Sequence, residues 1–254
     1  MKFESILFSV VEKTAIIKLN RPKALNALNS EVIKELDEAV LMIEADPQIR
    51  VVVIGSDKHF AAGADIKEMI EMNPEQARAF GFTPTFNKLE NLTKPTIAAI
   101  SGYALGGGLE LALVCDLRIA GPDAKLGLPE INLGIIPGAG GTQRLPRLIG
   151  ASRAKELVFQ GVIIDAPKAL QFGLVNEIAE NPMEAAMKLA EKIAGKAPLA
   201  LKAAKQCIAM TAKTDIRAGL EYEEVAWSSL YATKDQKEGM RSFAEKRKPT
   251  FVGE

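Results

Sequence analysis

Two glutamates lie where a carboxylate is chemically unusual. Glu110 interrupts an otherwise apolar, helix-like run from Leu109 to Cys115. Glu130 lies between apolar neighbours in a loop rich in glycine and proline. A carboxylate in apolar surroundings is costly unless it is paired or used in chemistry, and two carboxylates in different surroundings can serve as acid and base. A structural alternative stays open, in which Glu110 pairs with a core arginine such as Arg118 and Glu130 is an ordinary loop residue.

Small residues are concentrated in three segments around these glutamates: His59–Lys67, Ser101–Leu111 and Leu126–Thr142. The first two segments follow strand-like runs and lead into helix-like runs. N–H groups at a helix N-terminus are unpaired and carry the positive end of the dipole, and small residues let a ligand approach them. Two such turns side by side would form an oxyanion hole with two donors. Tight turns or close helix packing would also explain the glycines.

Other chemistries fit the sequence poorly. The segment Ser101–Leu111 does not give the dinucleotide pattern G-x-G-x-x-G, and no glycine is followed by the Lys-Ser or Lys-Thr of a P-loop. His59 is the single histidine and has no obvious nucleophile beside it, which argues against Ser-His-Asp or Cys-His catalysis. Cys115 and Cys207 lie in apolar helical stripes and are expected in the core. Their spacing predicts neither a metal site nor a disulfide framework.

The global composition is that of an ordinary globular protein. The chain of 254 residues carries 32 basic and 32 acidic side chains, so its formal net charge is zero. This charge predicts neither a nucleic-acid nor a membrane partner. The N-terminal stretch does not resemble a signal peptide, and no run of about 18 apolar residues occurs. With two cysteines in the whole chain, these features predict a cytoplasmic protein.

Strand and helix patterns alternate over the first part of the chain. β-branched residues and short apolar runs predict strands at Ile6–Ser9, Thr14–Leu19, Val51–Ile54 and Thr96–Ile100. Apolar residues at three- and four-residue spacing predict a helix with Ser30 as its N-cap and Asp46-Pro47 at its end. A further helix is expected over residues 74–91. This alternation predicts an α/β fold with mainly parallel strands.

The last third of the chain is predicted to be helical. Helix-start residues open four runs with an apolar face, at Asn181, Pro198, Asp215 and Thr233. We predict an α/β core with the active site over residues 1–195, and a C-terminal helical region over residues 196–254. The apolar stripes of that region suit packing on the core or on another subunit, and the sequence leaves both open.

Three motifs closely resemble those of the enoyl-CoA hydratase (crotonase) family, and the likeness extends along almost the whole chain. They are Phe60-Ala61-Ala62-Gly63-Ala64-Asp65-Ile66-Lys67, Gly102-Tyr103-Ala104-Leu105-Gly106-Gly107-Gly108-Leu109-Glu110, and Pro129-Glu130-Ile131-Asn132-Leu133-Gly134 with Pro137-Gly138-Ala139-Gly140-Gly141-Thr142-Gln143-Arg144-Leu145. The resemblance implies a crotonase-like (ClpP/crotonase) α/β fold, a spiral of ββα units with a C-terminal helical oligomerisation region. Homotrimers, often paired into hexamers, are implied as well.

The resemblance also implies a reaction and its residues. Water would add reversibly across the double bond of a trans-2-enoyl-CoA, with syn stereochemistry, giving a 3-hydroxyacyl-CoA without a separate cofactor. The N–H groups of Ala64 and Gly107 would bind the thioester oxygen, Glu110 would help to deprotonate water, and Glu130 would protonate C2. Substrate and CoA contacts are implied for Lys23, Ala24, Leu25, Ala62, Ala64, Asp65, Ile66, Lys67, Gly106, Gly107, Pro129, Gly138, Phe243 and Lys246. The last two belong to a region that often closes over CoA, sometimes from a neighbouring subunit.

Two alternatives remain within this resemblance. Enzymes of the same fold isomerise, decarboxylate or cleave acyl-CoAs through the same oxyanion hole, although many lack one of the two glutamates. Some relatives bind RNA through a lysine-rich helix, which here would involve Lys196, Lys202, Lys205 and Lys213.

The sequence departs from the family pattern at one position. Leu128 stands where some hydratases carry a polar residue, which leaves the pKa of Glu130 and the chain-length preference open. The segment 73–92 is expected to help line the acyl pocket.

Overall fold

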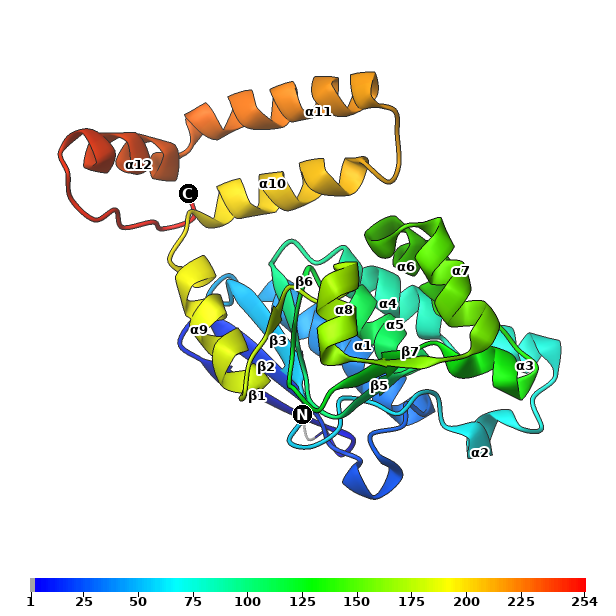
Figure 1. Ribbon diagram of the computed structural model, residues 1–254. Coiled ribbons are helices and arrows are strands. Elements are labelled where there is room, and N and C mark those ends of the chain that lie inside the picture. The colour runs from blue at the N-terminus through cyan, green and yellow to red at the C-terminus, as the bar shows by residue number, and fades with distance from the viewer. Residues whose placement is uncertain (1–2) are drawn as a thin grey trace.

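The computed structural model describes residues 3–254 and shows an α/β body with a helical extension (Figure 1). The larger sheet has the strand order β1-β2-β3-β4-β6-β9. Its strands are β1 (Ile6–Val11), β2 (Thr14–Leu19), β3 (Val51–Gly55), β4 (Thr96–Ile100), β6 (Leu117–Ala120) and β9 (Glu177–Ile178). The pair β1 and β2 is antiparallel and every other pair in this sheet is parallel, which confirms the predicted mainly parallel α/β fold.

A smaller sheet runs alongside the first. It consists of β5 (Tyr103–Leu105), β7 (Lys125–Gly127) and β8 (Ile163–Asp165), in the order β5-β7-β8. A bridge between Ala61 and Ala104 adds the segment after β3 to this layer. Thus β3, β4 and β6 are each followed by an extended segment in the second layer and then by a helix, which is the predicted ββα repeat. The predicted direct step from β4 to a helix is wrong, because β5 intervenes.

Helices cover both faces of the larger sheet. One face packs on α1 (Ser30–Ala45) through the main core, and α9 (Pro182–Ala194) covers the other face. Alternate residues of β3 divide between the two cores: Val52 and Ile54 face the main core, whereas Val51 and Val53 face the core under α9. Asn29 is the N-cap of α1, because its side chain accepts the Val32 N–H, so the predicted cap at Ser30 is off by one residue.

The predicted helix over residues 74–91 is two helices. The first is α3 (Pro74–Ala79) and the second is α4 (Phe82–Glu90). Gly81 between them has a φ of +91°, a left-handed conformation that suits glycine and ends the first helix. The remaining helices of the body are η1 (Pro22–Ala24), α2 (Ile66–Met69), α5 (Gly107–Leu113), η2 (Pro129–Leu133), α6 (Gly141–Ile149), α7 (Ala151–Gln160) and α8 (Ala166–Phe172).

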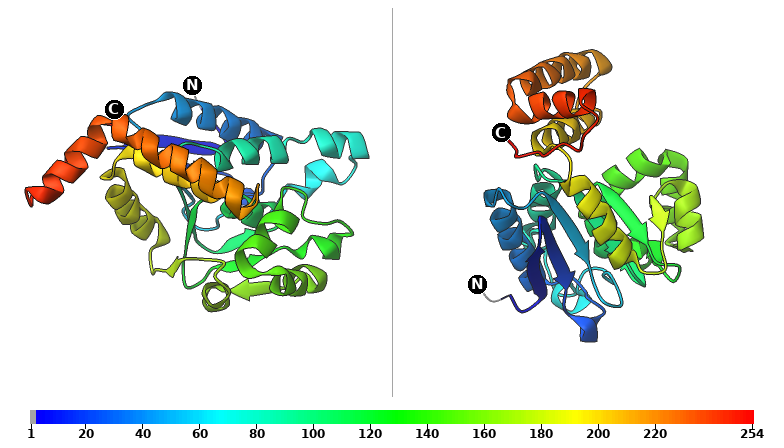
Figure 2. Two further views of the ribbon diagram at one scale, coloured as in Figure 1. Left: turned by 90° about the horizontal axis from the view of Figure 1, so that it is seen from above. Right: turned by 90° about the vertical axis from the view of Figure 1, so that its left-hand side faces the viewer.

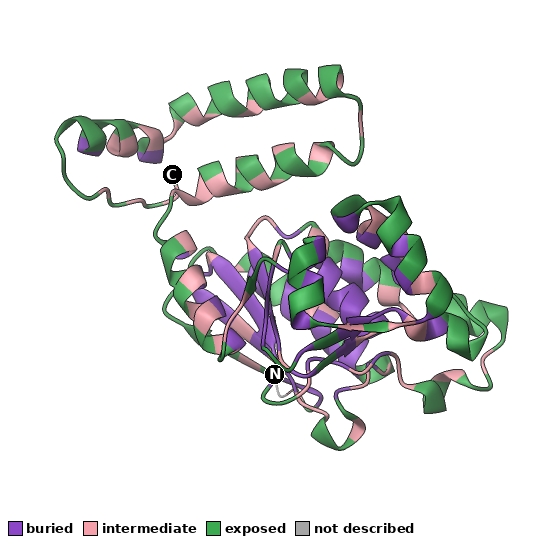
Figure 3. Ribbon diagram, viewed as in Figure 1, coloured by how far each residue is buried: buried purple, intermediate pink, exposed green. Residues whose placement is uncertain are grey.

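The C-terminal helices extend away from the α/β body, as Figures 1 and 2 show from three directions. They are α10 (Pro198–Met210), α11 (Ile216–Ser229), η3 (Leu230–Ala232) and α12 (Lys234–Ala244). No residue of α10 or α11 is fully buried within the described chain, residues 3–254 (Figure 3). Cys207 on α10 is therefore half-buried, and the prediction that it is a core residue is wrong. Residues 3–254 contain no helix long and apolar enough to cross a membrane.

Candidate active site

Two backbone N–H groups, those of Ala64 and Gly107, lie next to each other. Ala64 forms a bridge with Leu28, but the ladder hydrogen bonds there are Leu28 N–H to Gly63 O and Asp65 N–H to Leu28 O. The N–H of Ala64 therefore faces away from the ladder. Gly107 is the first residue of α5, where N–H groups lack helical partners. A Cβ on Gly107 would lie 3.6 Å from the Ala64 nitrogen, so the two donors are neighbours.

The three consecutive glycines allow close approach of other groups. Gly106 has a φ of +50°, and a Cβ on it would lie 3.0 Å from Glu130 Oε1. A Cβ on Gly108 would lie 2.2 Å from the carbonyl oxygen of Ala61. Gly106 leaves room for the carboxylate of Glu130, and Gly108 lets α5 pack closely against the segment that carries Ala61 and Ala64. The glycines therefore serve close packing and the site together.

Glu110 is buried, with 2% of its surface exposed, and it does not pair with Arg118. Its Oε1 accepts the N–H groups of Ala139, at 2.8 Å, and Gly141, at 2.7 Å. Arg118 instead donates to the carbonyl oxygens of Leu174 and Cys115. Burial raises the pKa of Glu110 above its usual range, and the two N–H groups and the charge of Arg144 offset part of that rise. Glu110 is thus a buried carboxylate whose charged form is supported by two donors.

Glu130, on η2, lies in different surroundings. It is 8% exposed, and its Oε2 has no hydrogen-bond partner among residues 3–254. Burial raises the pKa of Glu130 to about 7, and the negative charge of Glu110 adds to that effect. Leu128 beside it is fully buried and apolar, so it supplies no polar contact. Glu130, with its pKa raised to about 7 and no partner for Oε2, suits the role of the acid, and Glu110, which accepts two N–H groups, suits the role of the base.

Both glutamates and both N–H donors line one cavity of about 320 Å³. The aromatic and aliphatic part of its wall comes from Met69, Phe80, Phe82, Leu133, Ile135 and Ile136. An apolar cavity with a few convergent polar groups and a shifted pKa is the usual form of an enzyme active site. Two donors to one developing oxyanion, with an acid and a base beside them, suit addition to or proton transfer in a carbonyl compound.

A model of the family described as enoyl-CoA hydratase/isomerase matches residues 11–254. The chain belongs to the enoyl-CoA hydratase/isomerase family. It is 46% identical to a short-chain-enoyl-CoA hydratase of Clostridium acetobutylicum, over 98% of this chain and 97% of that one. It is 43% identical to a crotonyl-CoA hydratase of Syntrophomonas wolfei, over 99% of both chains.

Solved structures of this family share the whole fold. The crystal structure of an enoyl-CoA hydratase from Bacillus anthracis has a TM-score of 0.96 at 43% identity and covers 99% of this chain and 100% of its own. A structure described as enoyl-CoA hydratase subunit I from Geobacillus kaustophilus has a TM-score of 0.95 at 41% identity, over 100% of both chains. These likenesses confirm the crotonase-like fold that the sequence motifs imply.

Nine of the residues predicted for catalysis or for substrate and CoA binding in this enoyl-CoA hydratase/isomerase family member line the cavity. Those residues are Ala62, Ala64, Ile66, Gly106, Gly107, Glu110, Pro129, Glu130 and Gly138. Asp65 does not line the cavity. Its side chain caps the neighbouring helix α2 and pairs with Arg21 at 3.0 Å. Leu25 accepts the Ala62 N–H through its carbonyl oxygen and has a φ of +51°. Lys23, Ala24 and Lys67 do not line the cavity within the described chain.

Phe243 and Lys246 lie outside the site of their own chain. Phe243 is 87% exposed on α12, and Lys246 follows the end of that helix. Figure 1 shows α12 at the far end of the helical extension. Neither residue lines the cavity within residues 3–254, so their contact with CoA stays a prediction.

The structure adds three residues that the sequence did not single out. Ala139 and Gly141 donate to Glu110, and Phe82 lies beside Gly107. The glycine-rich stretch after Glu130 signalled a close approach of backbone, but it did not tell which group approaches. Three residues of the segment 73–92, which is expected to line the acyl pocket, line the cavity: Ala77 on α3, Phe82 on α4, and Phe80 between the two helices.

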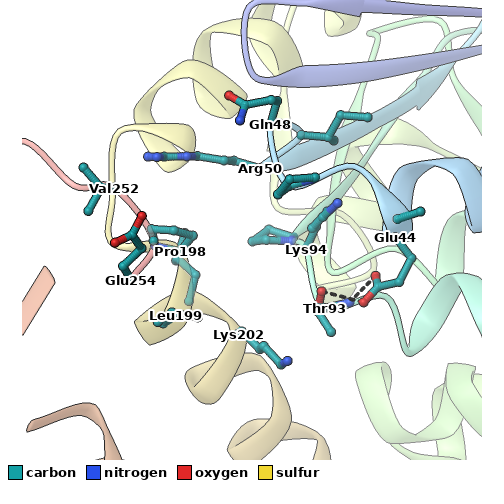
Figure 4. A pocket seen from close by; sticks show the side chains of 16 residues that line it. Glu44, Gln48, Arg50, Thr93, Lys94, Pro198, Leu199, Lys202, Val252 and Glu254 are labelled. Carbon is teal, nitrogen blue, oxygen red and sulfur yellow. Dashed lines mark hydrogen bonds between the residues drawn. The ribbon is translucent and has the colours of Figure 1, made fainter. Parts of the chain in front are cut away.

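A second, larger cavity of about 560 Å³ lies between the body and α10 (Figure 4). Its cations contact backbone carbonyls: Arg50 donates to Ala194 O and Phe251 O, and Lys94 donates to Asp46 O. Glu44 accepts two hydrogen bonds from Thr93. Arg50 thereby joins the C-terminal residue Phe251 to the body, whereas the contacts of Lys94 and Glu44 stay within the body, so this cavity is a structural junction.

Proposed function

We propose that this protein is an enoyl-CoA hydratase that adds water to a trans-2-enoyl-CoA and releases a 3-hydroxyacyl-CoA. The observation that carries the proposal is the pair Glu110 and Glu130, buried in different surroundings beside the N–H groups of Ala64 and Gly107. The hydratases among its relatives support the same activity. Loss of the absorbance of the conjugated thioester of crotonyl-CoA tests it directly, and an inactive wild-type protein would refute it.

The proposed step is a proton relay around one water molecule. The thioester oxygen accepts the N–H groups of Ala64 and Gly107, which polarises the double bond and stabilises the enolate charge. Glu110 takes one proton from the water as its oxygen bonds to C3, and Glu130 gives its proton to C2. The pair holds one proton before and after the step, so atoms and charges balance. Because both glutamates hold the water on one face, the addition is syn. CoA takes part as a portion of the substrate, and no further cofactor is required.

An isomerase is the second candidate, because the same oxyanion hole would stabilise the enolate formed from a 3-enoyl-CoA. That reaction needs one group to move a proton between C2 and C4, whereas this site holds two glutamates of different basicity. The second glutamate favours hydration. Incubation with a 3-enoyl-CoA, followed by detection of the 2-enoyl product, measures the isomerase activity.

We propose a short linear acyl group as the preferred substrate, since Phe82 closes the cavity beside the oxyanion hole. Its ring lies 3.8 Å from the Cβ position of Gly107. Phe80 and Phe86 support that ring, with centroids 4.7 and 5.7 Å away. Aromatic side chains that are packed in this way resist displacement.

Replacing Phe82 by alanine is expected to raise kcat/KM for octenoyl-CoA relative to crotonyl-CoA by about tenfold, because one or two extra methylenes in an apolar pocket are worth that much. Steady-state kinetics with both thioesters give the ratio. Phe159→Ala is the control, since Phe159 is 71% exposed on α7. An unchanged ratio in Phe82→Ala would show that another group limits the chain length.

The pH dependence of hydration follows from the raised pKa of Glu130, about 7. Hydration needs protonated Glu130, so kcat/KM should fall tenfold per unit as pH rises above about 7. Dehydration of the 3-hydroxyacyl-CoA starts from the same glutamate pair holding one proton, and the equilibrium constant of the reaction does not depend on pH. Its kcat/KM should therefore fall in parallel above about 7. Rates measured in both directions between pH 5 and 9 check this, and a kcat/KM for hydration that stays flat between pH 7 and 9 would contradict the assignment.

We also propose that the C-terminal helical region over residues 196–254 mediates assembly into trimers or hexamers, with Phe243 and Lys246 reaching the CoA of a neighbouring subunit. The support is the exposed apolar surface of that region, where Ile216 is 79% and Trp227 59% exposed. Lys205 pairs with Asp116 at 2.8 Å, which makes an RNA-binding lysine row less favourable. We also propose a cytoplasmic location, because the spacing of the two cysteines predicts no disulfide framework.

A further inference from the structure

The guanidinium of Arg144, on α6, joins three parts of the chain around the cavity. Its Nε and Nη2 donate to the two oxygens of Glu90, at 2.9 and 2.7 Å. Nη2 also donates to Asn87 Oδ1 at 2.9 Å, and Nη1 donates to the carbonyl oxygen of Ala139 at 2.9 Å. The side chain is only 14% exposed. A planar fork serves this set of acceptors, whereas the compact ammonium of a lysine would not.

Ala139 lies between Arg144 and Glu110 and is held at both ends. Its N–H donates to Glu110 at 2.8 Å, while its carbonyl accepts from Arg144. Gly140, the next residue, has a φ of +104°, and a Cβ on it would lie 1.9 Å from Arg144 Nη1. The N–H of Gly141 then donates to the same Glu110 oxygen at 2.7 Å. The loop that binds Glu110 is therefore shaped around the guanidinium of Arg144.

We propose that Arg144 is a positioning residue for the reaction: by holding the Ala139 carbonyl, it fixes the two N–H donors that orient the Glu110 carboxylate. This role rests on the proposed function, because it matters for turnover when Glu110 is the base. Glu110 is faced by Glu130 from η2 and by Arg144 from α6, and Glu90 from α4 offsets part of the arginine charge. The charge of Arg144 lowers the pKa of Glu110 and so opposes the effect of burial.

The same guanidinium also anchors the acyl wall of the cavity. Asn87 and Glu90 lie in the last turns of α4, and the first residue of that helix is Phe82. Phe82 lies beside Gly107, one of the two oxyanion donors. Loss of Arg144 would thus loosen the helix that lines the acyl group together with the loop that binds the base.

Arg144→Gln tests the proposal, with Arg144→Lys and Arg147→Gln beside it. Arg147 lies on the same helix, is exposed and donates to the Gln143 carbonyl, so it is a matched control. We expect Arg144→Gln to lower kcat for crotonyl-CoA hydration by about 10²-fold with little change in KM, since misplacing a catalytic group by about 1 Å costs that much. Arg144→Lys keeps the charge and should recover part of the loss, and Arg147→Gln should match the wild type.

A second readout does not depend on turnover. The carboxyl carbon of Glu110 is followed by NMR in protein labelled at glutamate, and its signal is identified by its absence in Glu110→Gln. The titration midpoint of Glu110 should be higher in Arg144→Gln than in the wild type, nearly restored in Arg144→Lys, and unchanged in Arg147→Gln. The acidic limb of the kcat profile should move in the same direction.

An unshifted Glu110 titration in Arg144→Gln, or a loss confined to KM or to thermal stability, would overturn the positioning role. If Arg144→Gln does not fold, Arg144→Lys decides: full kcat and an unchanged profile would refute a role for the fork. The two proposals can fail separately. If the wild-type protein does not hydrate crotonyl-CoA but the Glu110 titration still shifts in Arg144→Gln, the proposed function is refuted and the control of Glu110 by Arg144 stands.

Discussion

Replacing Glu130 by glutamine is expected to lower kcat for crotonyl-CoA hydration by about 10³-fold, within the usual contribution of general acid catalysis. Glutamine has nearly the same shape, but its amide has no proton to give to C2. The cavity wall and the N–H groups of Ala64 and Gly107 stay in place. KM for crotonyl-CoA should therefore change little. The loss of absorbance of the conjugated thioester under saturating substrate gives kcat.

Glu110→Gln should produce a loss of similar size for a different reason. The amide cannot take a proton from water, whereas its carbonyl oxygen can still accept the N–H groups of Ala139 and Gly141, which both donate to Oε1 of Glu110. The double variant should be hardly worse than either single one, because residues that act as a unit are not additive. Glu156→Gln, an exposed position on α7, is the control for the chemical change itself.

Stability separates loss of chemistry from loss of fold in these variants. The pKa of Glu130 is raised from 4.5 to about 7 in the folded chain, so the native state favours the proton. Ionising Glu130 therefore costs stability progressively as pH rises from about 4.5 through about 7. Glutamine removes that cost, so the Tm of Glu130→Gln at pH 8 should be no lower than that of the wild type. Near-normal turnover in either glutamine variant would sink the acid and base assignment.

The parallel core could be predicted because its signals are local and redundant. Continuous apolar runs predicted β3 and β4, and both strands are buried on both faces. The apolar spacing of α1 likewise placed Ile33, Leu36, Val40 and Ile43, all of which are buried. Glu110 and Glu130 stood out because polar residues in apolar surroundings conflict with local preference, and such conflicts concentrate at functional sites.

The rest of the site depends on contacts that no local pattern carries. The strands β5, β7 and β8 have three residues each, too few for a visible period, so residue patterns did not predict the second layer and only the family resemblance implied it. Gly81 separates α3 from α4, yet a single glycine within a helical pattern does not by itself predict the end of a helix. The two N–H donors to Glu110 lie 29 and 31 residues after it in the chain, and the glycines around them do not show that Glu110 is the acceptor. The apolar stripe on α10 predicted that Cys207 is a core residue, but a stripe does not show what the helix packs against, and α10 lies away from the α/β body (Figure 1).

One glycine joins these layers, and its replacement should damage both fold and activity. Gly108→Ala is expected to lower the free energy of unfolding by about 3 kcal/mol, because overpacking against a rigid neighbour costs that order of energy. The new Cβ would lie 2.2 Å from the Ala61 carbonyl oxygen and 2.7 Å from its Cβ. Neither α5 nor the Ala61 segment yields freely, since Ala61 is bonded on both sides to β5.

The same clash should reach the oxyanion hole, because the Ala61 segment leads directly to Ala64 while α5 carries Gly107. Separating these two donors is expected to lower kcat by about 10²-fold. Thermal unfolding followed by circular dichroism, together with crotonyl-CoA turnover below the transition, measures the two effects on one sample. Gly195→Ala is the matched control: its φ is −77° and its Cβ would meet nothing nearer than 3.6 Å, so stability should hold. If Gly108→Ala unfolds and turns over like the wild type, α5 and the Ala61 segment are not the rigid frame that holds Ala64 beside Gly107.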